Sequence, residues 1–134
     1  IPIENEVKVI EDYIQLEQLR YDDSLKINFS KSVDNWKQEI GPLILLPFVE
    51  NAFKHGASET RFNSFIDIDL SLQGKELKFQ VKNSRGEEIE SHQVAAGIGL
   101  KNVKRQLDLI YGENYRLDIR PKENIFLMEL LIQL

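Results

Sequence analysis

The feature that most constrains the fold is an alternation of apolar and polar residues that is interrupted once, at a glycine, and then resumes. Residues 65–72 alternate in this way, Gln73-Gly74-Lys75 follows, and residues 77–81 continue the alternation. A period of two predicts β-strands, and so short an interruption predicts a tight turn between them. We therefore expect a hairpin whose buried face consists of Ile66, Ile68, Leu70, Leu72, Leu77, Phe79 and Val81.

Shorter patterns predict the other elements. Apolar residues at helical spacing, or alternating residues, predict helices over residues 4–21, 42–55 and 100–111, and strands over residues 25–30, 115–120 and 125–134. The first helix either packs on the domain or pairs with a partner helix. Pro42 is expected to open the central helix, and Gly56 to end it. This order predicts an α+β fold, a two-layer α/β sandwich with a mixed, mostly antiparallel sheet of about five strands and three helices on one face.

Composition narrows the class of protein. The 134 residues, 42% of them hydrophobic, suffice for one ordinary core. The absence of cysteine excludes disulfides and thiolate metal sites and fits a reducing cytoplasm. A net charge of -5 gives no broad positive surface, so we expect no nucleic-acid partner. The sequence contains no apolar run long enough for a membrane helix, and its start at Ile1-Pro2 predicts a piece of a longer protein.

The stretch from residue 45 to residue 56 carries the strongest functional signal. Its apolar side chains recur at helical spacing and predict one buried face, formed by Leu45, Phe48, Val49 and Ala52. Its polar side chains gather on adjacent faces of the same turns; these are Glu50, Asn51, Lys54 and His55. Together they suit a hard cation bridged to phosphate oxygens. The alternative is a surface helix with ordinary solvated charges.

A second signal lies between residues 83 and 100. Residues 83–96 are polar and lack a period, which predicts a mobile loop of the kind that forms lids. Gly97-Ile98-Gly99 then leads into the next helical pattern. Glycines at a helix start leave backbone N–H groups bare, so this segment could bind an anion. The alternative is that the two glycines serve only close packing.

Taken together, these motifs resemble a known family. Residues 47–56, Pro-Phe-Val-Glu-Asn-Ala-Phe-Lys-His-Gly, look like the N box of histidine kinase catalytic domains, and residues 97–103 look like their second glycine box. The order of elements resembles the ATPase superfamily shared by gyrase, MutL and histidine kinases. More narrowly, residues 97–112 and the start of the chain look like the LytS-like branch; the matching residues at the start are Glu6, Tyr13, Leu16, Glu17 and Arg20.

The resemblance implies ATP and Mg²⁺ as ligands and gives roles to individual residues. Asn51 matches the magnesium ligand, and Lys54 matches the base that contacts phosphate. His55 is expected to contact ribose or phosphate, or to be structural. Glu50 would orient a metal-bound water or act in phosphoryl transfer, which makes Glu50 and Lys54 the catalytic candidates. Backbone amides would face the phosphates from Gly97, Ile98, Gly99, Leu100, Lys101 and Asn102.

Two positions depart from the family pattern. Asn83 stands where an aspartate normally accepts a hydrogen bond from the adenine amino group. Because an amide can turn over, we expect weaker selectivity for adenine. Pro47 stands where gyrase-like ATPases have a water-activating glutamate, and proline cannot be a general base. This favours transfer to a protein acceptor over fast hydrolysis.

The resemblance therefore implies the Mg-ATP-binding catalytic domain of a two-component sensor histidine kinase. Residues 1–23 would be a connector helix from the dimerisation and phosphoacceptor region, and residues 24–134 the ATP-binding domain. The γ-phosphoryl group would pass to a histidine upstream of this sequence, in a homodimeric parent. The implied setting is the cytoplasmic side of an inner-membrane protein, with a LytTR-type response regulator as partner. Alternatives are an anti-sigma-factor-type serine kinase and a degenerate, non-catalytic nucleotide-binding module.

Overall fold

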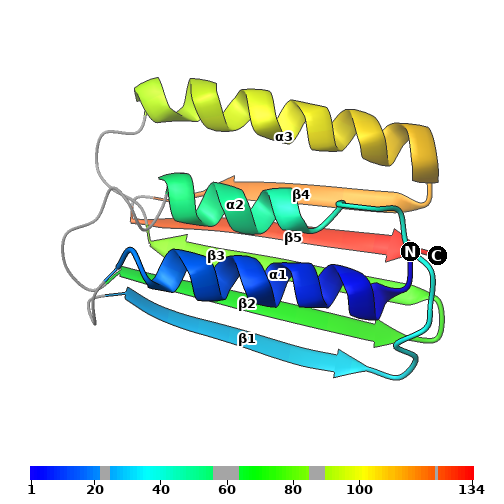
Figure 1. Ribbon diagram of the computed structural model, residues 1–134. Coiled ribbons are helices and arrows are strands. Elements are labelled where there is room, and N and C mark those ends of the chain that lie inside the picture. The colour runs from blue at the N-terminus through cyan, green and yellow to red at the C-terminus, as the bar shows by residue number, and fades with distance from the viewer. Residues whose placement is uncertain (22–24, 56–63, 85–89, 123) are drawn as a thin grey trace.

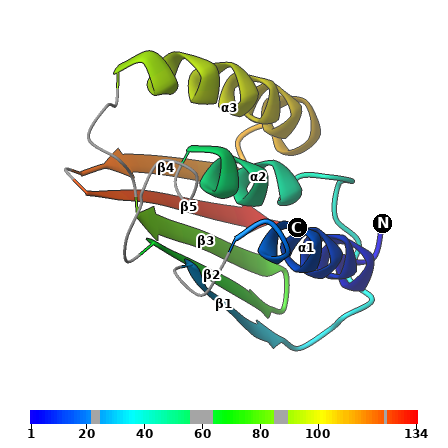
Figure 2. The same cartoon turned by 60° about the vertical axis from the view of Figure 1, so that its left-hand side comes forward.

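The computed structural model describes residues 1–21, 25–55, 64–84, 90–122 and 124–134, and describes only the backbone at residue 55 and residues 90–99. Three helices lie on one face of a five-stranded sheet (Figures 1 and 2). The elements are α1 (Ile3–Gln18), β1 (Leu25–Val33), α2 (Leu46–His55), β2 (Ser64–Gln73), β3 (Glu76–Ser84), α3 (Glu90–Tyr111), β4 (Tyr115–Pro121) and β5 (Ile125–Gln133). The α+β fold expected from the sequence is confirmed.

The sheet is built around the hairpin of β2 and β3. The strand order is β1-β2-β3-β5-β4, with β1 parallel to β2 and every other pair antiparallel. Ile68 lies opposite Val81, and Leu70 lies opposite Phe79, so the predicted apolar face is continuous across the hairpin. Gly74 adopts φ +63° in the turn, a conformation that favours glycine. The edge strand β4 carries Asp118 between two arginines.

The core lies between this sheet face and the helices. The hairpin's seven apolar residues are all buried there, together with four residues of α1, which are Ile3, Val7, Ile10 and Ile14. α1 therefore packs on the domain, which was one of the two alternatives. Two other apolar residues of α1, Val9 and Leu16, are exposed, and so is Leu19 directly after the helix.

α2 begins later than the sequence predicts. Pro42 was expected to open the helix, but the helical residues start at Leu46. Leu43 has φ +55°, which lies outside the right-handed helical region and keeps the helix from starting there. The backbone N–H groups of Leu43, Leu45 and Leu46 donate hydrogen bonds to the side chain of Glu6 in α1. The predicted cap at Gly56 lies outside the described residues.

α3 begins earlier than the sequence predicts. Residues 83–96 were expected to form a loop, whereas β3 continues to Ser84 and the helix starts at Glu90. Residues 90–96, Glu-Ser-His-Gln-Val-Ala-Ala, contain neither glycine nor proline and include strong helix formers, so local propensity explains the extension. The predicted end is confirmed, because Gly112 follows α3 with φ +56° and its N–H donates to the Asp108 carbonyl oxygen.

Candidate functional site

The polar residues of α2 lie next to its buried face, as the sequence predicts. Glu50 and Asn51 are half-buried and Lys54 is exposed. On the inward face the helix buries Phe48, Val49, Ala52 and Phe53. Asn51 and Lys54 therefore project from a helix whose packing fixes its rotation about its own axis.

Aromatic contacts with α1 and with Tyr21, which follows it, hold the C-terminal half of α2. The ring of Tyr13 meets the ring of Phe53 edge to face, with centroids 5.5 Å apart, and the centroid of the Tyr21 ring lies 6.1 Å from that of Phe53. Burial raises the pKa of Tyr13 first, and the negative charges of Glu17 and Glu50 raise it further. The negative charge of Glu50 on α2 therefore acts on Tyr13 of α1.

Asn83, near the end of β3, is the clearest ligand-directed group in the described part of the chain. The residue is 2% exposed. Its Nδ2 donates to the Ser84 carbonyl oxygen at 2.8 Å, so Oδ1 points away from that carbonyl group. Oδ1 is the one buried side-chain polar atom without a hydrogen-bond partner among the described residues. An unpaired buried acceptor costs about 1–3 kcal/mol, so a ligand with an N–H donor would relieve that cost.

The elements that carry these residues meet at one end of the domain. β3 and α2 both finish, and α3 begins, at the left-hand end of the molecule in Figure 1. α2 and α3 lie side by side on the helical face in both views (Figures 1 and 2). The structure thus brings Asn51, Lys54 and Asn83 to one end of the domain, beside the start of α3.

The glycine segment is not the open anion cradle that the sequence predicts. Gly97, Ile98 and Gly99 lie within α3, past the first turn that begins at Glu90. Backbone N–H groups beyond the first four residues of a helix bond to carbonyl groups one turn back. In this state the amides from Gly97 onward are therefore engaged. Leu100 packs against the core, whereas Lys101 and Asn102 are exposed. The side chain of His55 lies outside the described residues.

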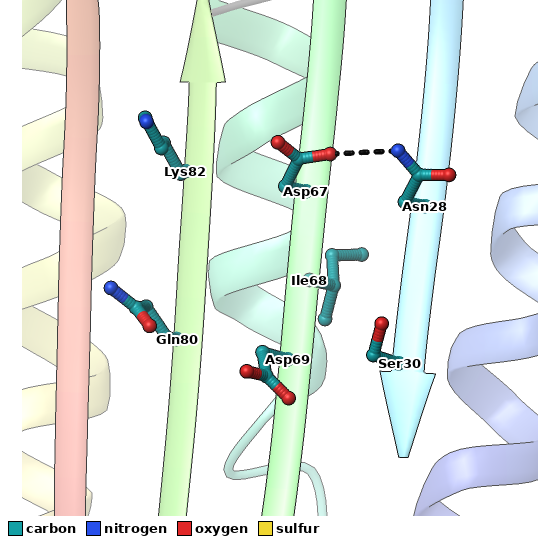
Figure 3. Close-up of a pocket in the computed structure, with 7 residues that line it drawn as sticks. All are labelled: Asn28, Ser30, Asp67, Ile68, Asp69, Gln80 and Lys82. Carbon is teal, nitrogen blue, oxygen red and sulfur yellow. Dashed lines mark hydrogen bonds between the residues drawn. The ribbon is translucent and has the colours of Figure 1, made fainter.

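A pocket of about 340 Å³ lies on the other face of the sheet and belongs to a different region. Figure 3 shows its lining residues in front of the strands and the helices behind them. Asn28 of β1 donates to Asp67 of β2 at 3.0 Å there. Because Asp67 alternates with the core residues Ile66 and Ile68, its side chain points away from α2. This pocket is not part of the candidate site.

Curated proteins with similar sequences are sensor kinases. The chain is 24% identical to the sensor histidine kinase BtsS of Escherichia coli K12 over 119 residues, which is 89% of this chain and 21% of that protein. It is 24% identical to the sensor protein kinase HptS of Staphylococcus aureus RF122 over 139 residues, covering 93% of this chain and 26% of that protein. The chain thus spans about a quarter of these relatives or less. No family model matches the sequence.

Solved structures agree on the architecture. The histidine kinase domain of the Erythrobacter litoralis EL346 blue-light activated histidine kinase superposes with a TM-score of 0.71 at 16% identity, covering 100% of this chain and 66% of that one. The catalytic domain of histidine kinase ThkA gives 0.57 at 19% identity, covering 98% and 89%. The fold is that of a histidine kinase catalytic domain.

None of the helices in the described residues of this histidine kinase fold is long and apolar enough to cross a bilayer.

Sequence reasoning missed the role of one residue in this kinase fold. Glu6 matched the LytS-like pattern, but the sequence interpretation did not assign its carboxylate to the start of α2. It is fully buried and accepts from three backbone N–H groups. A charged residue on the otherwise apolar face of residues 3–14 is the signal that could have found it.

Proposed function

We propose that this chain is the ATP-binding catalytic domain of a two-component sensor histidine kinase of the LytS-like branch. The observation that carries the proposal is the buried, unpartnered Oδ1 of Asn83, at the end of β3 and at the same end of the domain as the polar turn of α2. The sensor kinases among the curated relatives and the fold support it.

Asn83 recognises the adenine ring. Its Oδ1 can accept from the exocyclic amino group of adenine, whereas guanine presents an acceptor oxygen at the equivalent position. Weakened selectivity would require the amide to turn over. The bond from Nδ2 to the Ser84 carbonyl oxygen opposes this, because two acceptor oxygens would then face each other. The geometry therefore supports retained selectivity for adenine, whereas the sequence alone predicts weaker selectivity.

Asn51 and Lys54 hold the charged part of the nucleotide. The side-chain oxygen of Asn51, half-buried on α2, is a suitable ligand for Mg²⁺, and the Lys54 ammonium can neutralise phosphate charge. Bound magnesium supplies charge neutralisation at the phosphates. His55 is a further candidate for a phosphate or ribose contact. The amides of Gly97 to Asn102 join this site only if the N-terminal part of α3 unwinds, since they are inside the helix here.

The phosphoryl acceptor is a histidine outside these 134 residues. Pro47 cannot activate water, which favours transfer to a protein side chain over hydrolysis. Glu50 orients a metal-bound water or assists the transfer. The remaining partners follow the sequence interpretation, with a LytTR-type response regulator and a homodimer formed by upstream helices. We place the domain on the cytoplasmic side of an inner-membrane protein, with residues 1–23 as the connector to those helices.

Titration calorimetry with ATP, with and without Mg²⁺, tests the proposal. Asn51→Ala should weaken the magnesium-dependent binding by about 100-fold, because it removes a metal ligand. Asn28→Ala is the matched control, since it removes an amide on the opposite sheet face and should leave affinity unchanged. Equal affinities for all three proteins would contradict the site. ATP binding without magnesium dependence would instead favour the degenerate nucleotide-binding module.

The same titration with GTP tests the role of Asn83. Wild type should bind ATP at least about tenfold more tightly than GTP, and Asn83→Asp should discriminate to a similar degree. Comparable ATP and GTP affinities in wild type would refute the role given to Asn83 Oδ1. In the parent protein, phosphate from ATP is expected on histidine in acid-labile form. Acid-stable phosphoserine on a partner would indicate the serine kinase alternative.

A further inference from the structure

The carboxylate of Glu6 is buried and bonded at both oxygens to the segment that leads into α2. Glu6 is 0% exposed. Its Oε1 accepts from Leu45 N at 2.8 Å and from Leu46 N at 3.3 Å, and its Oε2 accepts from Leu43 N at 3.0 Å. One side chain of α1 therefore satisfies three backbone donors that lie 37 to 40 positions away in the sequence.

Two of these donors, the N–H groups of Leu45 and Leu46, stand at the helix start and would normally lack a partner there, whereas Leu43 lies in the segment before it. The first N–H groups of a helix have no partner within it, and a nearby serine, threonine, asparagine or aspartate commonly accepts from them. Residues 41–47, Gly-Pro-Leu-Ile-Leu-Leu-Pro, contain no such side chain. The negative charge of Glu6 takes this role and also interacts favourably with the positive end of the helix dipole.

The short helix depends on contacts of this kind. α2 has 10 residues, fewer than an isolated helix needs to be stable in water. Glu6 binds its N-terminal end, and the rings of Tyr13 and Tyr21 contact Phe53 near its C-terminal end. The segment before it is also held from α3, because Gly41 N–H donates to the Tyr111 hydroxyl oxygen at 2.9 Å.

We propose that Glu6 is a positioning residue for the nucleotide site. It acts on that site only through α2. By fixing the residue at which α2 begins, it fixes the direction in which Asn51 and Lys54 project. One residue of slippage in the helix start would turn each side chain by about 100° around the helix axis. The inference rests on the proposed function, because it assigns Glu6 to the site that binds Mg-ATP.

The experiment compares Glu6→Gln with two control variants in the 134-residue chain. The glutamine amide keeps the shape of the side chain but offers one acceptor oxygen in place of two. Its NH₂ group would then face a backbone N–H. Ile10→Val weakens the packing of α1 one turn further along, where Ile10 is fully buried. Asp34→Asn alters a carboxylate that accepts from Gly74 N at 2.7 Å, in the turn between β2 and β3.

Two measurements separate positioning from simple destabilisation. Calorimetric affinity for Mg-ATP should fall about tenfold in Glu6→Gln and stay unchanged in both controls, at a temperature where every variant is folded. The side-chain NH₂ signals of Asn51 in the ¹H–¹⁵N spectrum of the nucleotide-free protein should shift in Glu6→Gln alone. Unchanged affinity and unshifted Asn51 signals would overturn the proposal, even if Glu6→Gln is less stable than wild type.

A third measurement needs no variant, so it tests the positioning role of Glu6 even if Glu6→Gln does not fold. If Glu6 couples the start of α2 to the nucleotide site, Mg-ATP must stabilise that start in return. Amide hydrogen exchange at Leu45 and Leu46 should slow on addition of Mg-ATP more than exchange at Gly74. Equal changes at all three amides would exclude the coupling. If wild type binds no Mg-ATP, the proposed function fails, and the Asn51 signals then test the positioning of α2 alone.

Discussion

α2 and α3 lie side by side and both depart from the helix starts that the sequence predicts, but in opposite directions. α2 starts at Leu46, after the predicted Pro42, and α3 starts at Glu90, before the predicted glycine segment. The start of α2 is set by Glu6, from a distant part of the chain. The early start of α3 follows from residues 90–96 themselves. The residues that set the start of α3 are therefore its own, whereas the residue that sets the start of α2 belongs to another helix.

The two helices also differ in where they are anchored. α2 is held near both ends by α1. In α3, the described side chains that reach the core are Leu100, near its midpoint, and Val103 and Leu107, which are buried in its second half. Tyr115 of β4 donates to Asp108 in the same half. We infer that the second half of α3 belongs to the cooperative core, and the two proline variants below test whether its first half does so as well.

Proline substitutions along α3 should give the largest effect. Lys104→Pro lies between the buried positions and should cost about 3 kcal/mol or more, because it removes a helical hydrogen bond and clashes with the preceding turn. Ala96→Pro makes the same change in the first half and should cost less than about 1 kcal/mol, since only the turns before it need unwind. Urea unfolding measures both free energies.

The two proline variants also test whether the N-terminal part of α3 unwinds when nucleotide binds. Ala96→Pro should leave Mg-ATP affinity equal to that of wild type or higher, because it favours the unwound state in which the glycine amides are bare. Equal costs for the two prolines would remove the distinction between the halves of α3. A loss of Mg-ATP affinity in Ala96→Pro would show that the extended helix is the state that binds nucleotide.

Two leucine-to-glycine substitutions, one before α2 and one in α3, should have smaller and opposite effects on stability. Leu43, before α2, is 50% exposed and has φ +55°, so Leu43→Gly relieves backbone strain and should stabilise the protein by about 0.5 kcal/mol. Leu109 is 80% exposed in α3, and Leu109→Gly should destabilise by about 1 kcal/mol, since glycine is a poor helix former. Thermal unfolding should move the two midpoints in opposite directions. Two downward shifts would mean that Leu43 contributes by packing.

The smallest effect concerns two tyrosines, one beside each helix. Burial raises the pKa of Tyr13, next to α2, and raises that of Tyr115, next to α3, to about 12, with the Asp108 bond as a further cause. Unfolded tyrosine ionises near pH 10, whereas the folded hydroxyls stay protonated. Stability should therefore be complete below about pH 10 and fall as the pH rises toward about 12.

Phenylalanine variants assign this pH dependence to its sources. Tyr13→Phe and Tyr115→Phe should each reduce the loss of stability between about pH 9 and about pH 11, measured by urea unfolding, and Tyr13→Phe should reduce it more. Tyr21→Phe provides a comparison, because burial raises the pKa of Tyr21 as well. If neither Tyr13→Phe nor Tyr115→Phe changes the slope, the pH dependence has another origin.

The parts of the fold that the sequence predicts are those determined by neighbouring residues. The hairpin of β2 and β3 follows from a period of two and one glycine turn, and the buried face of α2 follows from helical spacing. The start of α2 could not be predicted, because its hydrogen-bond acceptor is a side chain from α1. The predicted polar turn with Asn51 and Lys54 lies where expected, but the amides after Gly97 are not bare, because α3 starts at Glu90 and runs through both glycines.

The composition of the outer strand β4 bears on how densely such domains can be crowded together. Arg116 and Arg120 flank Asp118, and Pro121 closes the strand. Charged side chains and a proline along an open edge discourage another chain from adding a strand there. At the β4 edge, a second copy of this domain is therefore discouraged from extending the sheet, even when copies lie close together.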